Sequence, residues 1–165
     1  MDAATIIDTL VTDRTQADVE RVKALATKGF AAMTADEQAE WLAGMKGAYD
    51  ASDLNRVGTA LNYLAARLSS ICGRSIAWTA KTDWAVTDII TASQAAEYRR
   101  QIQDIRDALA YPAGTPDAPE LGRLTYTDAN NIERILKLCE DLIVNVAKSF
   151  RHTGAAECAA GGLLT

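Results

Sequence analysis

The stretch DASDLNRVGTALNYLAARLSSIC, residues 50–72, decides the fold. Its apolar residues follow one another at intervals of three, four, three, four and three: Leu54, Val57, Leu61, Leu64, Leu68 and Ile71. This alternation places all six on one side of an α-helix, as in helices that pack at a shallow angle on their neighbours. Gly58 lies on the same side, where the missing side chain would let another helix approach closely. Gly73 ends the predicted helix.

Four polar residues at the start of this helix form a candidate structural network. Ser52 is the expected N-cap, and Asp53 would take the first helical position. Arg56 would reach back to Asp53 or onto an acid elsewhere, and Asn55 would pin the preceding turn or a neighbouring helix end. We expect Ser52, Asp53, Asn55 and Arg56 to serve architecture rather than a reaction.

Further helix starts are marked by threonines that have an acid or amide three residues later, the pattern of a capping box. The pairs are Thr15 with Asp18, Thr34 with Glu37, and Thr91 with Gln94. The first pair opens a helix predicted over 16–28, and the second opens a short helix that ends near Gly44 to Gly47. Apolar residues again step by three and four behind Thr91, and also along a last helix predicted from about Thr127 to about Arg151.

Three long helices and about two short ones cannot bury these apolar stripes alone, which predicts an all-α, up-and-down helical bundle. Residues 74–90 lose the helical period and are expected to form an irregular excursion. The loop 111–124 holds all three prolines. We expect a leader at 1–14, a single bundle domain at 15–152, and a flexible or partner-docking tail at 153–165.

Composition narrows the function classes. The 165 residues carry a formal net charge of −5, and no basic cluster exceeds Arg99-Arg100, so nucleic acid is not an expected partner. No apolar run reaches the length of a membrane span, and the first residues lack a signal-peptide pattern. The three cysteines are far apart and odd in number, which suits a reducing compartment of origin.

Catalytic patterns are missing from the sequence. The single histidine, His152, has no nucleophile beside it in the sequence. It stands close to the end of the last predicted helix, where a protonated imidazole would interact favourably with the negative end of the helix dipole. Acid pairs such as Asp104 with Asp107 stand beside basic residues, where ion pairing on a helix face explains them. Phosphate-binding loops and metal-ligand spacings do not occur. We therefore expect no enzyme, no catalytic residue, no cofactor and no metal.

The loop that contains Lys81-Thr82-Asp83-Trp84 is the candidate binding loop. With Trp78 it brings two indoles, a cation and an acid together, a combination that would suit a sugar or a peptide. The competing interpretation is that Trp84 seals the end of the bundle and Asp83 caps a turn. The candidate residues are Trp78, Lys81, Asp83 and Trp84.

The sequence as a whole resembles a family of small helical proteins from the tail and other structural-gene regions of Firmicutes phages and prophages. The residues that carry this resemblance are TDRTQADV (12–19), MTADEQAEWLAGMKGAYDASDLNRVG (33–58), KTDW (81–84), DII-T (88–91), LTYTDANNIERIL (124–136) and the F-x-x-x-G from Phe150 to Gly154. They cover most of residues 12–154 in one order. The chain departs from the family at its end, where it has ECAAGGLLT in place of a Tyr- and Gly-containing segment.

The resemblance implies a non-enzymatic virion structural or adaptor protein, tail or fibre associated, that acts through assembly with other virion proteins or with further copies of itself. It implies a location in the bacterial cytoplasm during assembly and in the phage-like particle afterwards. The family brings no catalytic residue to this chain. The alternative function is a cell-surface glycan- or peptide-binding module that uses the Trp78–Trp84 loop.

Overall fold

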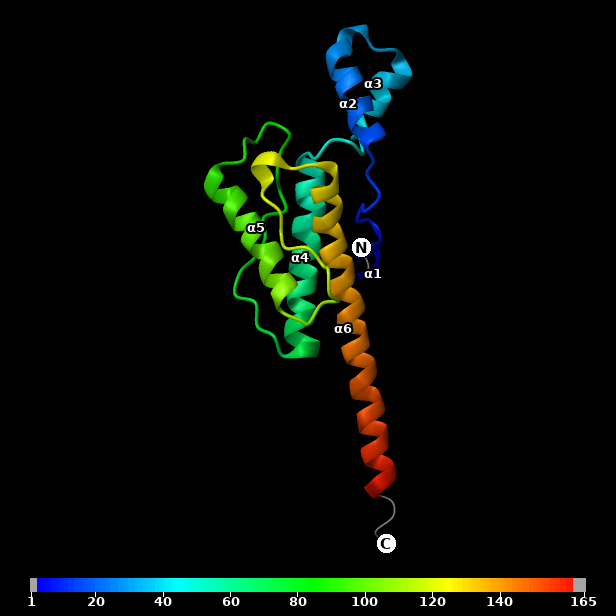
Figure 1. Cartoon of the computed structure of the whole chain (residues 1–165), viewed down its shortest axis with the longest axis vertical. Coiled ribbons are helices and arrows are strands. Elements are labelled where there is room, and N and C mark those ends of the chain that lie inside the picture. Colours follow the sequence, from blue (N-terminus) through cyan, green and yellow to red (C-terminus); the bar gives the residue numbers. More distant parts are fainter. Residues whose placement is uncertain (1–2, 162–165) are drawn as a thin grey trace.

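The computed structural model describes residues 3–161, and side chains within residues 6–150. Within residues 3–161 the chain forms helices and no strand, which confirms the predicted all-α bundle. Three long helices, α4, α5 and α6, make the body of the molecule (Figure 1). The α-helices are α1 (Ala3–Asp8), α2 (Gln16–Lys28), α3 (Ala35–Leu42), α4 (Ala51–Cys72), α5 (Ala92–Asp107) and α6 (Tyr126–Gly161). Short 3-10 turns occupy Phe30–Ala32 and Leu121–Arg123.

The predicted threonine caps are confirmed for α2, α3 and α5, each with a reciprocal capping box. The cap predicted for α4 is wrong. Asp50, not Ser52, is its N-cap, and Asp53 is the third helical residue, whose carboxylate accepts a hydrogen bond from the Asp50 backbone N–H at 3.0 Å. Both Asp50 and Ser52 are good capping residues. Asp50 takes the N-cap position because Asp53 stands three positions after it and completes the capping box.

The three long helices all run in the same direction, which corrects the up-and-down order expected from the sequence. Arg56 on α4 pairs with Glu133 on α6, and about two to three turns further along both helices Arg67 pairs with Glu140. Tyr98 in the first half of α5 likewise meets Tyr49, which stands two residues before α4, and their hydroxyl oxygens are 2.6 Å apart. Figure 1 shows that all three helices begin at the same end of the molecule.

Two long irregular segments, 73–91 and 108–125, make this parallel order feasible. The first runs back along α4, where the Ala80 N–H donates to Asn62 at 2.7 Å and the Trp84 N–H donates to Asn55 at 2.7 Å. An extended residue spans about 3.3 Å whereas a helical residue rises about 1.5 Å, so 73–91 can return along the whole of the 22-residue α4. An up-and-down order needs only short loops.

Gly58 marks a close approach, but of the returning segment rather than of a helix. A Cβ on Gly58 would lie 2.2 Å from the Lys81 carbonyl oxygen, which no side chain could tolerate without movement. The residues expected to line the apolar side of α4 do so: Val57, Leu61, Leu64 and Leu68 are fully buried, and the end residues Leu54 and Ile71 are partly buried.

The core lies between α4, α5 and α6, and α1 packs against α4 and α6. Leu10 is buried in this core, so the predicted leader is an integral part of the bundle. Cys139 is fully buried among apolar residues, and Cys72 is partly buried and free, as expected for cysteines that act as small apolar side chains.

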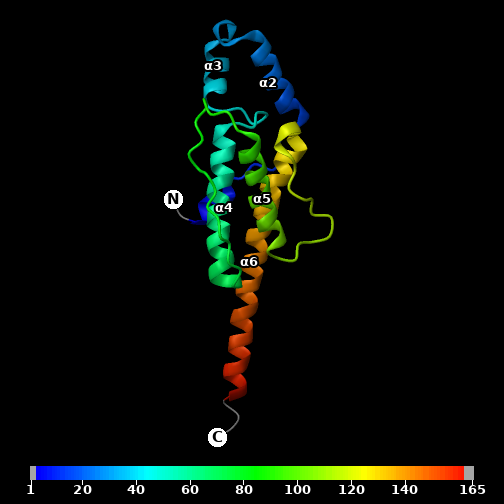
Figure 2. The same ribbon diagram turned by 90° about the vertical axis from the view of Figure 1, so that its left-hand side faces the viewer.

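Two parts extend beyond the three-helix body (Figures 1 and 2). Residues 15–47, which contain α2 and α3, form a helical hairpin at the end where the long helices begin. At the opposite end α6 continues past α4 and α5. It reaches Gly161, ten residues beyond the predicted end at Arg151. Residues 162–165 lie outside the described part of the chain, so docking of the tail remains a prediction.

Candidate functional site

A cluster of four charged side chains lies inside the bundle. One nitrogen of Arg14, Nη2, is 2.7 Å from the Asp53 carboxylate and 2.6 Å from that of Glu133. Arg56 also contacts both acids, with its Nη2 2.8 Å from Glu133. Arg14 and Asp53 are buried and Glu133 is fully buried, while Arg56 lies at the edge. Two cations thus face two anions, and the cluster is electrically balanced.

This cluster ties the chain before α2 to helix α6. The Val11 N–H donates to Glu133 Oε2 at 2.6 Å, and the Arg14 N–H donates to Asn130 Oδ1 at 2.9 Å. The Asn130 side-chain amide in turn donates a hydrogen bond to the Arg14 carbonyl oxygen at 2.9 Å. Burial lowers the pKa of the Arg56 guanidinium, but its contacts with Glu133 and Asp53 outweigh burial and raise this pKa overall. The arrangement holds two segments together and leaves neither acid free to act as a base.

The four residues of the predicted network are divided between different tasks. Asp53 and Arg56 join the ion cluster, and Arg56 makes both of the contacts that the sequence left open, one to Asp53 and one to a distant acid. Asn55 holds the returning segment through the Trp84 backbone N–H and carbonyl. Ser52 donates its hydroxyl to Asp50 at 2.6 Å.

The sequence interpretation missed Arg14 and Glu133, the two partners that complete the cluster. A signal for Glu133 was present, because it stands four residues after Ala129 and three before Leu136, both buried, and therefore on the inner face of α6. An acid on such a face needs a buried cation as partner. No comparable periodicity marks Arg14, which lies in an irregular segment.

The candidate binding loop does not bring its two indoles together. The Trp78 Nε1 donates to Asp104 on α5 at 2.8 Å, whereas Trp84 is only 8% exposed and lies beside the start of α4. The Lys81 ammonium stands 4.8 Å above the Trp84 ring and 2.9 Å from the Asp83 carboxylate. The hydrogen bond from Lys81 lowers the pKa of Asp83. Trp84 thus packs onto the bundle, as the competing interpretation held, whereas Asp83 does not cap the turn, because the Ala85 N–H donates to Asp88.

A hollow of about 360 Å³ lies beside Trp84. Polar groups from the returning segment and from α5 surround it, among them Lys81, Gln94, Glu97 and Gln101. The Trp84 Nε1 is buried without a hydrogen-bond partner among the described residues. Trp78 belongs to a different hollow, with Arg100 and Asp104.

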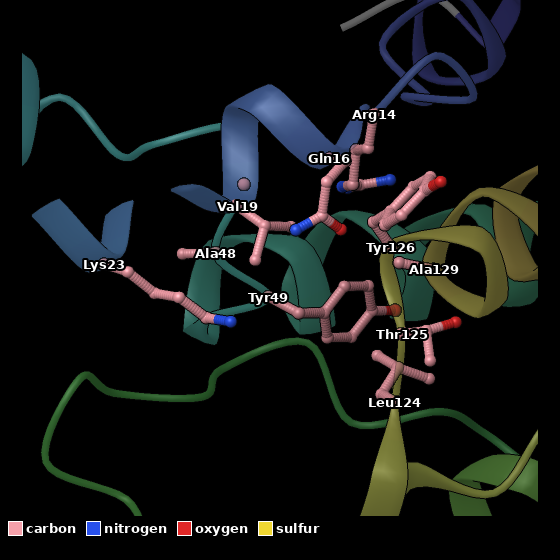
Figure 3. A pocket seen from close by; sticks show the side chains of 11 residues that line it. Arg14, Gln16, Val19, Lys23, Ala48, Tyr49, Leu124, Thr125, Tyr126 and Ala129 are labelled. Atoms are coloured by element: carbon pink, nitrogen blue, oxygen red, sulfur yellow. The ribbon is translucent and has the colours of Figure 1, made fainter. Parts of the chain in front are cut away.

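A second hollow, of about 400 Å³, lies at the base of the hairpin (Figure 3). Gln16, Val19 and Lys23 reach into it from α2, opposite Tyr49 and the residues that begin α6, Thr125 and Tyr126. The two ends of the hairpin approach each other closely here, because a Cβ on Gly47 would lie 2.1 Å from the Asp18 carbonyl oxygen. We find no acid–base pair among the side chains that line this hollow.

The hairpin groove is a concave surface with a mainly apolar lining. It has a volume of about 420 Å³ and lies between α2, α3 and the turn after Trp84. Its apolar lining residues are Val22, Trp41, Leu42, Ala43, Met45, Ala48 and Val86. Leu42 is 75% exposed and Val86 is 94% exposed. Exposed apolar side chains gathered around a groove are typical of protein interaction surfaces and of ligand-binding grooves.

The described residues contain neither a cluster of metal ligands nor a membrane-spanning helix. No group of three or more His, Cys, Asp or Glu side chains there could hold a metal ion. Within the same residues, no helix is long and apolar enough to cross a membrane. The side chain of His152 lies outside the described set. Comparison of the chain with protein-family models, with curated proteins and with solved structures finds no match.

Proposed function

We propose that the protein is a non-enzymatic structural or adaptor subunit of a phage-like particle, associated with the tail or a fibre, that works through protein–protein contacts. The observation that carries this proposal is the hairpin groove, where Leu42 and Val86 leave apolar surface open to solvent. The sequence resemblance to phage structural proteins supplies the biological setting. The ion cluster supports the proposal as well, because it fixes the base of the hairpin that presents the groove.

The test is the protein content of purified particles. Particles released by the bacterium that encodes the chain would be purified on a density gradient and analysed by quantitative mass spectrometry. We expect the chain to be present in a fixed ratio to the major tail proteins. Immunogold labelling would then place it on the tail or fibre. Absence of the chain from intact particles would contradict the proposal.

The glycan- or peptide-binding alternative rests on the hollow beside Trp84, whose polar lining suits hydroxyl-rich ligands. Lys81 covers the indole face in this structure, so a sugar would have to displace it. A Glu97→Ala variant keeps Trp84 in place and removes one polar group from the hollow. If the alternative holds, this variant loses binding to purified cell walls while its thermal unfolding is unchanged.

A further inference from the structure

The hollow at the base of the hairpin has the size of a small-molecule site. Its volume is about 400 Å³, and ligand pockets in proteins measure about 300–1,000 Å³. Its apolar side chains come from both parts of the molecule that meet there: Val19 from α2, Ala48 and Tyr49 from the segment before α4, and Leu124 and Ala129 from around the start of α6. A molecule bound in this hollow would therefore touch the hairpin and the three-helix body at once.

The charged side chains in the lining of this hollow are both positive. They are Arg14 and Lys23, and no Asp or Glu lines it. The acids of the ion cluster balance Arg14, although its Nε is buried without a hydrogen-bond partner among the described residues. Lys23 forms no ion pair with any described residue, whereas Lys28, Lys46 and Lys81 each pair with a carboxylate. The hollow thus has one positive charge that its own lining leaves uncompensated.

Lys23 brings this charge to an aromatic wall. Figure 3 shows its side chain extending from α2 toward the Tyr49 ring. The ring is held in place, because the hydroxyl oxygens of Tyr49 and Tyr98 are 2.6 Å apart and the Arg14 guanidinium stands 5.6 Å from the ring centre. Lys23 is exposed, so a ligand can reach its ammonium group from solvent.

The acids nearest in sequence to the hollow are already engaged elsewhere. Asp18 and Asp128 accept hydrogen bonds from the threonine caps of α2 and α6. Glu20 accepts a hydrogen bond from the Gln16 side-chain amide at 3.2 Å. None of these three acids lines the hollow or pairs with Lys23, so none takes the place that an anionic group of a ligand would occupy.

We propose that this hollow binds a small organic anion, a carboxylate with a flat apolar body. The carboxylate would pair with the Lys23 ammonium, and the body would lie against Tyr49, Val19 and Leu124. An inorganic anion would leave the apolar wall unused, and a neutral apolar molecule would leave Lys23 without a partner. A charge-assisted hydrogen bond and the burial of apolar surface would both contribute to binding.

Binding in this hollow would also fix the hairpin more firmly to the body. A ligand that binds only the folded arrangement stabilises that arrangement. Because the ligand would contact both α2 and the start of α6, it would oppose movement of one relative to the other. The inference goes beyond the proposed function and does not depend on it.

The experiment compares two probes, naphthoate and its neutral amide, naphthamide, which share the ring system and differ in charge. Each is titrated into the full, isotope-labelled chain up to about 10 mM, and amide chemical shifts are followed by NMR. We expect naphthoate to shift the signals of Val19, Lys23 and Ala48. Naphthoate should bind at least about tenfold more tightly than naphthamide, because its charge pairs with the ammonium group.

Variants of Lys23 assign the charge that is responsible. Lys23→Gln should weaken naphthoate binding at least about tenfold and leave naphthamide binding unchanged, whereas Lys23→Arg should retain most of the affinity. Lys148→Gln, which removes an exposed lysine from the other end of α6, is the matched control and should bind both probes as the wild type does.

Three results would overturn the inference. One is equal affinity of the wild-type chain for the two probes, or no shift at the highest concentration. Another is a set of shifted signals centred on the hairpin groove instead of this hollow. The third is naphthoate binding by Lys23→Gln that equals that of the wild type.

Discussion

Arg14 and Glu133 lie 119 positions apart in the chain, yet Nη2 of the arginine is 2.6 Å from the glutamate carboxylate. Both side chains are buried. Because Arg14 immediately precedes the hairpin and Glu133 lies on α6, this contact helps to set where the hairpin stands relative to the long helices, together with the hydrogen bonds between Arg14 and Asn130. The position of the hairpin groove therefore depends on a buried ion pair rather than on apolar packing alone.

Replacing Glu133 with glutamine should destabilise the protein strongly. The substitution keeps the shape but leaves Arg14 and Arg56 with Asp53 as the one remaining acid in the cluster, and breaking a buried charge pair costs about 3–5 kcal/mol. Urea unfolding monitored by circular dichroism measures this loss. Glu20→Gln, on the exposed face of α2, is the control and should change stability by no more than about 0.5 kcal/mol. Equal effects of the two substitutions would mean that the cluster does not stabilise the fold.

Gly58→Ala should destabilise the protein by displacing the returning segment. The new methyl group would meet the Lys81 carbonyl at 2.2 Å, and such overpacking costs about 1–3 kcal/mol. Gly122→Ala is the matched control, because nothing lies within 4 Å of the added atom there. The free energy of unfolding of the two variants is compared in the same denaturant. A Gly58→Ala protein as stable as Gly122→Ala would contradict the close approach of segment 73–91.

The sequence predicts the helices well because their signals are local. Thr34 with Glu37 and the apolar residues of α4 act over a few positions, so caps and periodicity can be recognised without knowing the fold. The direction predicted for α5 was wrong for a different reason. It depends on whether segments 73–91 and 108–125 turn back at once or run the length of a helix, and no local pattern encodes that choice.

The candidate site was harder to predict because its partners are distant in sequence. Asp53 and Arg56 could be recognised as a pair three residues apart on a helix. The other half of the cluster comes from Arg14 and Glu133, which meet them only once α6 lies beside α4. The loop with Trp78 and Trp84 failed as a single platform because two residues six positions apart in an extended segment lie far along it.

The hairpin should lose stability at acidic pH before the bundle does. Hydrogen bonds from Lys28 and from Arg21 lower the pKa of Glu37 and of Glu40, respectively, below the ordinary value of 4.5. A carboxyl group whose pKa is lowered by folding stabilises the folded state at pH values above its pKa in the unfolded chain. This stabilisation disappears as the pH falls through the pKa of the group in the folded state. Amide hydrogen exchange from pH 6 down to about pH 3 should show α2 and α3 losing protection first. Simultaneous loss of protection in α4 and α6 would contradict this expectation.

Cys139 should resist alkylation in the folded protein while Cys72 reacts. Burial raises the pKa of the Cys139 thiol to about 11, although its contact with the Tyr111 hydroxyl acts in the opposite direction. With that pKa about one thiol in a thousand is ionised at pH 8, and the thiolate is the reactive form. Cys72 lies at the end of α4 and is only partly buried. Burial also raises the pKa of the Cys72 thiol, but Cys72 is the more accessible of the two. Peptide mapping after timed treatment with iodoacetamide should therefore show Cys72 labelled at least about tenfold faster. In denaturant the alkylation rates of Cys72 and Cys139 should converge, which would show that the difference is due to the fold. Rapid labelling of Cys139 in the native protein would contradict the expectation and show that the packed interface between α4 and α6 opens readily.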